Sequence, residues 1–247
     1  MSLADVVLLA FAGLAAGAIN SVAGGGSLVS FPAMVATGMP TLSANVTNLI
    51  AVTPGYVGGS IGYRAELRGQ AARARRLGVA MVFGALAGSV ILLVAPDSAF
   101  EVVAPALILV ACAALAFQPR IVAAARARKL DEHSPALPAL AFAGGIYGGY
   151  FGAGLGIMTL ALLAAFIDDD LQRLNAVKGV LSLVVSIAAA LVVGVFGPVH
   201  WDACAIVAAT SLLGGRFGVV IAKRLAAQTL RYAVAAYGLV VAIALAV

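Results

Sequence analysis

Two short stretches of this sequence set polar side chains or glycines inside apolar surroundings, and both have the composition of an anion site. The first stretch joins an asparagine and a serine to a glycine triplet and a second serine: Asn20, Ser21, Gly24, Gly25, Gly26 and Ser27. The second is interrupted by spaced glycines: Gly152, Gly154 and Gly156. Since glycine in a helix interior costs about 1 kcal/mol relative to alanine, each stretch predicts a helix break. A helix that restarts there directs free backbone N–H groups into the interior, where they attract anions. Close helix packing through small residues is the alternative.

Amide side chains follow each glycine stretch at a matching distance. Asn45 and Asn48 are three residues apart and share one helix face, and Asn175 and Lys178 repeat this spacing. Together they predict a cavity lined by neutral donors and one positive charge. Interhelical hydrogen bonding is the alternative for the amides, and extension toward the membrane surface is the alternative for Lys178. Arg216, inside a glycine-rich apolar run, either faces an anion or extends toward the next basic residues.

Catalytic and metal chemistry have little support in this sequence. The carboxylates lie in loops or at segment ends, and His133 and His200 lie in loops predicted on opposite sides of a membrane. A carboxylate proton relay and a carrier for hard cations are therefore disfavoured. A phosphate-binding P-loop needs a lysine after Gly26, where this chain has Ser27. We predict no enzyme activity, no bound metal and no cofactor, and we interpret Asp168–Asp170 as a solvated turn and helix N-cap.

The composition identifies the elements that must position these groups. Of the 247 residues, 63% are apolar and only 10% are charged, against about 25% charged in a typical soluble protein. A soluble enzyme, a nucleic-acid-binding module and a disulfide-stapled domain are thereby excluded. Since a spanning helix needs about 20 residues, the chain reads as an all-helical polytopic membrane protein. Its apolar segments are 3–22, 25–39, 42–63, 74–95, 99–118, 136–151, 154–168, 171–196, 201–222 and 227–246.

The segments repeat once along the chain. Four pairs of residues match at one constant spacing: Gly26 with Gly156, Asn45 with Asn175, Gly84 with Gly214, and Gly88 with Gly218. Near the start of each half the spacing is two residues longer, with Gly13 over Gly145 and Gly17 over Gly149. The predicted organisation is a first repeat of about five segments at 1–119, a basic linker at 120–135 and a second repeat at 136–247. Each repeat begins with a glycine-broken helix.

The placement of basic residues indicates that the two repeats have opposite orientations. The loop after the third segment is rich in arginine, whereas its equivalent in the second half, 194–201, contains no Lys or Arg. The loop after the fourth segment, 96–98, lacks basic residues, whereas its equivalent contains Lys223 and Arg224. Because basic loops stay in the cytoplasm, we expect inverted-topology repeats with both termini outside a bacterial inner membrane. Five crossings per half, or a re-entrant hairpin at the start of each half, both satisfy this pattern.

The residues described above resemble the motifs of the TauE/SafE family of membrane transporters, often called the sulfite exporter family. The resemblance rests on Gly17–Pro32 with its Ala23–Ser27 core, Pro40–Asn48, Gly145–Gly156 and Leu174–Gly179. It covers nearly the whole chain. The second glycine run departs from the family's tight triplet, since Leu155 interrupts it. The resemblance implies transport, chiefly export, of small sulfur-containing or carboxylate anions such as sulfite or sulfoacetate.

The residues and the resemblance together predict a secondary transporter for a small anion that works by alternating access. Inverted repeats that surround a midplane site are a recurring architecture of such proteins. A passive anion channel and a membrane assembly factor are the alternatives. The expected partners are the anion and the lipid bilayer, with no nucleic acid and with a homodimer possible. The sequence leaves open the substrate and whether protons or sodium ions are coupled to its transport.

Overall fold

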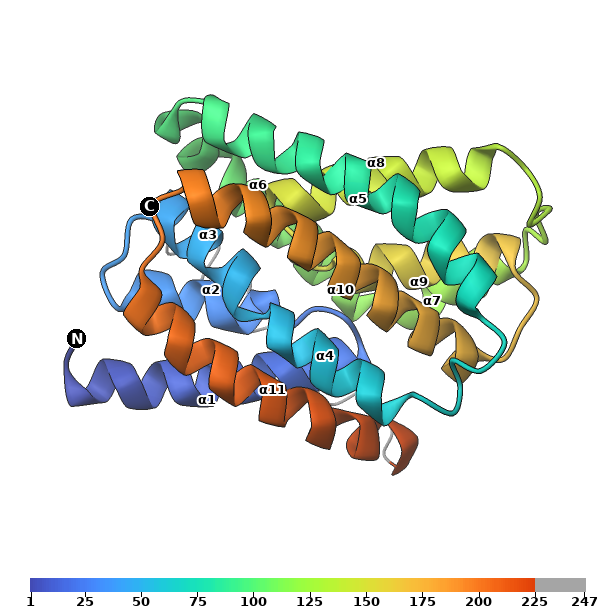
Figure 1. Cartoon of the computed structure of the whole chain (residues 1–247), viewed down its shortest axis with the longest axis horizontal. Helices are drawn as coiled ribbons and strands as arrows, with labels where there is room; N and C mark the ends of the chain where they lie inside the picture. The colour runs from blue at the N-terminus through green and yellow to red at the C-terminus, as the bar shows by residue number, and fades with distance from the viewer. Residues whose placement is uncertain (225–247) are drawn as a thin grey trace.

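The glycines and prolines of the sequence divide the chain into helices of unequal length in the computed structural model, which describes residues 1–224 (Figure 1). The helices are α1 (Leu3–Val22), α2 (Ser27–Ala36), α3 (Thr41–Ala51), α4 (Thr53–Gly62), α5 (Ala71–Val94), α6 (Asp97–Ala116), α7 (Gln118–Arg126), α8 (Ala136–Tyr150), α9 (Leu155–Phe166), α10 (Leu171–Phe196) and α11 (Trp201–Arg224). The predicted all-helical class is confirmed for the described residues. The last predicted segment, 227–246, lies outside them.

Among residues 1–224, five helices are long and apolar enough to cross a membrane. They are α1, α5, α6, α10 and the Trp201–Val220 portion of α11. Helices α2 and α9 contain 10 and 12 residues. At 1.5 Å per residue they are only about 15 and 18 Å long, against a hydrocarbon core of about 30 Å. These two short helices therefore cannot cross the membrane by themselves.

Each short helix completes a hairpin with the helix before it. In Figure 1, α2 leads back to the end of the molecule where α1 begins, and α9 leads back to the end where α8 begins. The N–H of Leu130, in the loop before α8, donates to the carbonyl of Ala165 near the end of α9 at 2.8 Å. Of the two arrangements that the sequence allowed, the structure has the hairpins that return to their side of entry.

The predicted third apolar segment, 42–63, forms two helices, because the chain breaks at Val52. Pro54 causes this break. It has no N–H to donate, and its ring clashes with the carbonyl four residues earlier, that of Ile50. Helix α3 therefore ends before it and α4 begins with the proline in its first turn. The equivalent helix of the second half, α10, has no proline and is continuous over 26 residues.

The two halves of the chain interlock. Helix α1 packs most extensively against α11, and α8 packs most extensively against α5. Glycines permit these close approaches, because an added Cβ would overlap a carbonyl oxygen of the facing helix: Gly17 with Ser211, Gly145 with Met81, Gly84 with Phe142, and Gly214 with Leu14. The first helix of each half is thus held by a helix of the other half.

The glycine contacts of the two halves are alike. Gly17 meets the carbonyl of Ser211 in α11, and Gly145 meets the carbonyl of Met81 in α5. The predicted repeat had instead set Gly13 opposite Gly145. Gly13 is four residues before Gly17, or about one helical turn, so the two glycines share a face of α1.

Basic residues collect at one end of the molecule. The loops 63–70, 127–135 and 167–170 lie at this end, which we call the basic end (Figure 1). The loops at the opposite end, 37–40, 95–96 and 197–200, contain neither Lys nor Arg. The short helix α7 lies within the predicted basic linker and exposes Arg120 and Arg126.

Candidate functional site

The two helix breaks contact each other at Gly24 and Gly156. A Cβ atom added to either glycine would lie 2.7 Å from the Cα atom of the other. Helix α6 lies beside both breaks, with Leu115 against the first and Ala111, about one helical turn earlier, against the second. The two glycine stretches, which are distant in the sequence, therefore form one central region.

The glycines at the breaks are required for different reasons. Gly24, Gly152 and Gly154 have φ angles of +86°, +77° and +80°, in the left-handed region that favours glycine. Gly26 has an ordinary φ, but a Cβ atom there would overlap the carbonyl oxygen of Ala16 in α1. The first group lets the chain reverse direction, and Gly26 lets α2 pack tightly on α1.

Side chains from other helices bind the carbonyl groups that the first break frees. The last turn of a helix leaves carbonyls with no partner in that helix. At the end of α1, Lys178 Nζ donates to Asn20 O at 3.0 Å, Asn175 Nδ2 to Ser21 O at 3.1 Å, and Gln118 Nε2 to Ala23 O at 2.9 Å. Two of these donors come from α10 in the second half. The ammonium group of Lys178 also interacts favourably with the negative, C-terminal end of the α1 dipole.

The second break is supported in a similar way by the first half. Asn45 Nδ2 in α3 donates to Tyr150 O at the end of α8 at 3.0 Å, and Ser89 Oγ in α5 donates to Gly149 O at 3.2 Å. Asn45 thus donates to a carbonyl at the second break, as Asn175 does at the first. Each half uses its asparagine to hold the broken helix of the other half.

All four asparagines of the chain are buried in this region. Besides the two just described, Asn20 Oδ1 accepts the backbone N–H of Gly26 at 2.8 Å. Asn48 Oδ1 accepts the hydroxyl of Ser30 in α2. The predicted amide cluster is therefore brought together. Asn20, Asn45 and Asn175 each bond to backbone at a break, and Asn48 bonds to a hydroxyl of the first hairpin.

Several polar groups of this region have no hydrogen-bond partner among the described residues. The buried side-chain atoms are Asn20 Nδ2, Asn45 Oδ1, Asn48 Nδ2, Gln118 Oε1, Thr159 Oγ1, Asn175 Oδ1 and Ser182 Oγ. The backbone N–H groups are those of Gly25, Ser27, Ala153, Gly154 and Gly156. An unpaired buried polar group costs about 1–3 kcal/mol. Such groups are what a polar ligand would satisfy.

Lys178 is the one buried charged side chain in the part of the chain that the structure describes, with 1% of its surface exposed. It lies at the first break, as do the unpaired N–H groups of Gly25 and Ser27. The hydrogen bond from Nζ to Asn20 O turns the ammonium inward rather than toward the membrane surface. The first break thus brings the lysine together with unpaired N–H groups.

Arg216 lies apart from the breaks. Its side chain is exposed on α11, where it shares a surface pocket with Arg64. The rest of this pocket is formed by Ile61, Gly62, Val219 and Val220. The structure therefore does not bring Arg216 together with the other predicted site residues.

The sequence analysis missed four polar residues of this region: Tyr63, Gln118, Thr159 and Ser182. The hydroxyl of Tyr63 accepts Asn175 Nδ2 at 2.8 Å and lies 3.5 Å from Ser21 O. Gln118, Thr159 and Ser182 are each buried. Each is a polar residue in or next to an apolar segment of the sequence, outside the glycine and asparagine patterns.

Comparisons with known proteins agree with this architecture. The model of the family described as "Sulfite exporter TauE/SafE" matches residues 9–245. A probable membrane transporter protein of Escherichia coli strain K12, YfcA, is 28% identical over 85% of this chain and 78% of its own length. A probable membrane transporter protein of Haemophilus influenzae is 27% identical over 87% of this chain and 84% of its own length.

A third relative, the probable membrane transporter protein ORF9 of a Sinorhizobium species, is 26% identical over 85% of this chain and 82% of its own length. No solved structure matches the chain significantly. The family match spans both glycine breaks, all four asparagines and the interlocked helices. The chain therefore belongs to the sulfite exporter TauE/SafE family of multi-pass membrane transporters, and it is not an enzyme.

Proposed function

We propose that this protein is a secondary transporter that exports a small oxyanion, such as sulfite or an organosulfonate like sulfoacetate. The observation that carries the proposal is the meeting of two helix breaks at Gly24 and Gly156, with unpaired backbone N–H groups on both. Free N–H groups at a helix start bind anions through hydrogen bonds and through the helix dipole. The buried ammonium of Lys178 supplies the charge.

The polar groups of the site favour an anion over a cation. No carboxylate side chain is buried among the described residues, whereas Lys178 is. Hard cations prefer carboxylate and carbonyl oxygens, and the freed carbonyls at the end of α1 are already bound by Lys178, Asn175 and Gln118. The amides of Asn20 and Asn48 keep free N–H groups that can donate to an oxyanion.

The proposed mechanism is alternating access between two inverted repeats, residues 1–119 and 136–247, joined by the linker 120–135. Equivalent glycine contacts, which recur at nearly the same spacing in the two halves, support this relationship. So do the two hairpins, which enter from opposite ends (Figure 1). Movement of one hairpin against the other would open the Gly24–Gly156 contact to one side at a time. By the distribution of basic loops, the basic end is cytoplasmic and both termini are outside.

The test is anion flux into proteoliposomes that contain the purified protein. Sulfite, sulfoacetate, sulfate and a plain carboxylate are compared, each with and without a pH gradient and a sodium gradient. We expect saturable flux of a sulfur oxyanion, and the gradient that drives it identifies the coupling ion. Flux that rises linearly with concentration would favour a passive anion channel. Absence of flux for all four anions, from folded protein, would overturn the anion assignment and favour an assembly factor.

A further inference from the structure

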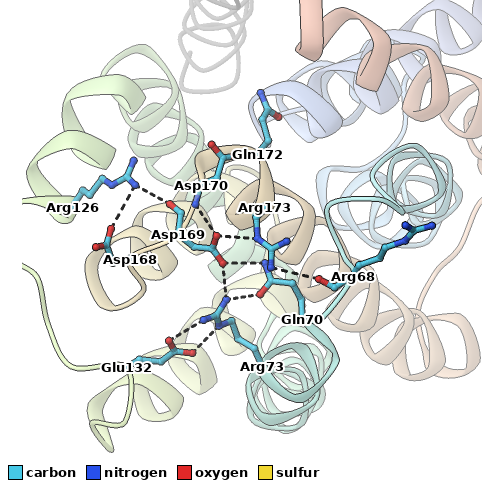
Figure 2. Close-up of polar contacts among 10 residues, drawn as sticks. All are labelled: Arg68, Gln70, Arg73, Arg126, Glu132, Asp168, Asp169, Asp170, Gln172 and Arg173. Atoms are coloured by element: carbon cyan, nitrogen blue, oxygen red, sulfur yellow. Dashed lines mark hydrogen bonds and ion pairs between the residues drawn. The ribbon is translucent and has the colours of Figure 1, made fainter.

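We propose that Arg73, Glu132 and Asp169 form a latch that closes the basic end over the first helix break and separates once in each transport cycle. The latch joins α5, the linker and the loop between α9 and α10. The role of the latch in a transport cycle rests on the proposed function. Its closed state follows from the contacts of these residues (Figure 2).

Arg73 is the centre of the latch. Its Nε and Nη2 atoms donate to the two carboxylate oxygens of Glu132 at 2.7 and 2.9 Å, and its Nη1 donates to Asp169 Oδ2 at 3.0 Å. Such a two-pronged arginine–carboxylate pair fixes direction as well as distance. One side chain of the first half thus holds both the linker and the second half.

Asp169 also contacts three further residues. Its carboxylate accepts Arg173 Nε at 2.9 Å and Gln70 Nε2 at 3.4 Å, and its carbonyl accepts Arg126 Nη2 at 2.8 Å. The neighbouring Asp170 caps α10 through the N–H of Gln172, as the sequence predicted. The solvated-turn interpretation applies to Asp168, whose side chain is fully exposed. Asp169 instead joins segments that are distant in the sequence.

A second layer of contacts joins the same two segments in the interior. Tyr63 precedes Gln70 and Arg73, and Asn175 follows Asp169. The hydroxyl of Tyr63 accepts Asn175 Nδ2 at 2.8 Å, and Asn175 also binds Ser21 O at the first break. Asn175 is six residues after Asp169, which is about 9 Å along a helix axis. The latch therefore lies at the basic end, on the side of the Asn175 contacts away from the first break.

The latch is suited to repeated opening. The side chains of Arg73, Glu132 and Asp169 are 23%, 33% and 19% exposed, so water reaches them and can replace their contacts as they part. The ion pairs of Arg73, Arg126, His133 and Arg173 lie at the basic end. At the opposite end, the contact between loop and helix is a neutral hydrogen bond from the N–H of His200 to Thr47 Oγ1 at 3.0 Å. The basic end of this conformation is thus closed by charged contacts that water can replace.

The test measures access to the first break from the basic end. A single cysteine at Ser21→Cys, in a background with Cys112→Ala and Cys204→Ala, reports this access to a charged maleimide that does not cross membranes. Membrane vesicles of both orientations are prepared, and Arg128→Cys, at an exposed position of the linker, identifies those that present the basic end. In these vesicles, we expect Asp169→Asn to raise the labelling rate of Ser21→Cys roughly tenfold, because the closed population falls.

Matched variants distinguish the effect of breaking the Asp169 contacts from the effect of removing a nearby negative charge. Asp168→Asn removes the adjacent carboxylate, which meets only Arg126 at 3.8 Å, and it is expected to leave labelling unchanged. Asp169→Glu keeps the charge and is expected to restore slow labelling. If Asp169→Asn does not fold, Glu132→Gln removes the other partner of Arg73 and is expected to raise labelling severalfold.

Equal labelling of the parent and both latch variants, or equal acceleration by Asp168→Asn, would overturn the latch. Labelling requires no transported substrate. A failure of the anion assignment in the flux assay is therefore distinguishable from a failure of the latch, because each is read from a separate measurement.

Discussion

Gly24 and Gly156, which belong to opposite halves of the sequence, touch through their backbones where the two broken helices meet. An added Cβ on either would lie 2.7 Å from the other's Cα atom. Only glycine allows this approach, because any side chain would force the two hairpins apart. This contact joins the two helix breaks into one central region.

Gly156→Ala is expected to destabilise the protein by about 1–3 kcal/mol through overpacking and to abolish flux, because it separates the hairpins. Gly38→Ala is the control. Gly38 has a φ of +86° but no neighbour within 4 Å of an added Cβ, so it should cost about 1–2 kcal/mol of left-handed strain and keep flux. Thermal unfolding and the flux assay measure both variants. Full flux in folded Gly156→Ala would show that the contact is not needed for transport.

A pair of glycines in α5 tests the packing of the two halves. An added Cβ on Gly84 would overlap Phe142 O of α8, whereas one on Gly78 would lie 3.7 Å from Val184 Cγ2, an ordinary contact. Gly84→Ala is expected to lower the free energy of unfolding by about 1–3 kcal/mol. Gly78→Ala is expected to be neutral or to stabilise by up to about 1 kcal/mol, since alanine is the better helix former. Equal stability of the two variants would contradict the α5–α8 contact.

Asn45→Ala and Asn175→Ala are each expected to abolish flux, by at least about 100-fold, while leaving a folded protein. Each substitution leaves a freed carbonyl at a break without its amide donor, which costs about 1–3 kcal/mol locally and displaces the broken helix. Thr210→Ala is the control, because its hydroxyl bonds only to Ile206 and Val207 of its own helix. Normal transport by both asparagine variants would remove these residues from the site.

Lys178→Gln is expected to raise the KM for the anion about tenfold or more, which corresponds to about 1.4 kcal/mol, with a smaller effect on folding. Glutamine keeps an N–H donor for the carbonyl of Asn20, so the variant removes the charge and keeps the hydrogen bond. Lys178→Arg is expected to retain more affinity than Lys178→Gln. An unchanged KM in Lys178→Gln would show that the ammonium does not contribute to anion binding.

The latch is expected to be insensitive to pH over the physiological range. Partial burial tends to raise the pKa of Asp169, but the N–H of Asp170 and the guanidinium groups of Arg73 and Arg173 outweigh it and hold this pKa below its usual value of 3.8. A carboxyl whose pKa is lower in the folded state stabilises that state above the unfolded pKa and loses this effect as the pH falls through the folded pKa.

The difference in Tm between the parent and Asp169→Asn should therefore stay constant between about pH 5 and pH 8 and shrink only below about pH 4. Thermal unfolding in detergent at a series of pH values measures it. A difference that already disappears near pH 6 would show that another group controls the contact.

Local features of the sequence predicted much of the molecule. Apolar segments and sparse charges identified a polytopic helical protein, because the bilayer accepts only apolar spans of sufficient length. Glycines predicted both breaks, since their backbone freedom is a property of each residue by itself. The apolar pattern over 42–63 did not show the helix break at Val52, because apolarity does not reveal the missing N–H of Pro54.

What the sequence by itself determined about this protein is therefore its class, its breaks and the set of amides near them. Only the tertiary structure decided that Gly24 meets Gly156, that Asn45 and Asn175 each hold the break of the opposite half, and that Asp169 joins Arg73 rather than water. Spacing along one helix shows which residues share a face. It does not show which face of a distant helix lies opposite, because that depends on how the whole set of helices packs to bury its polar groups and fill its interior.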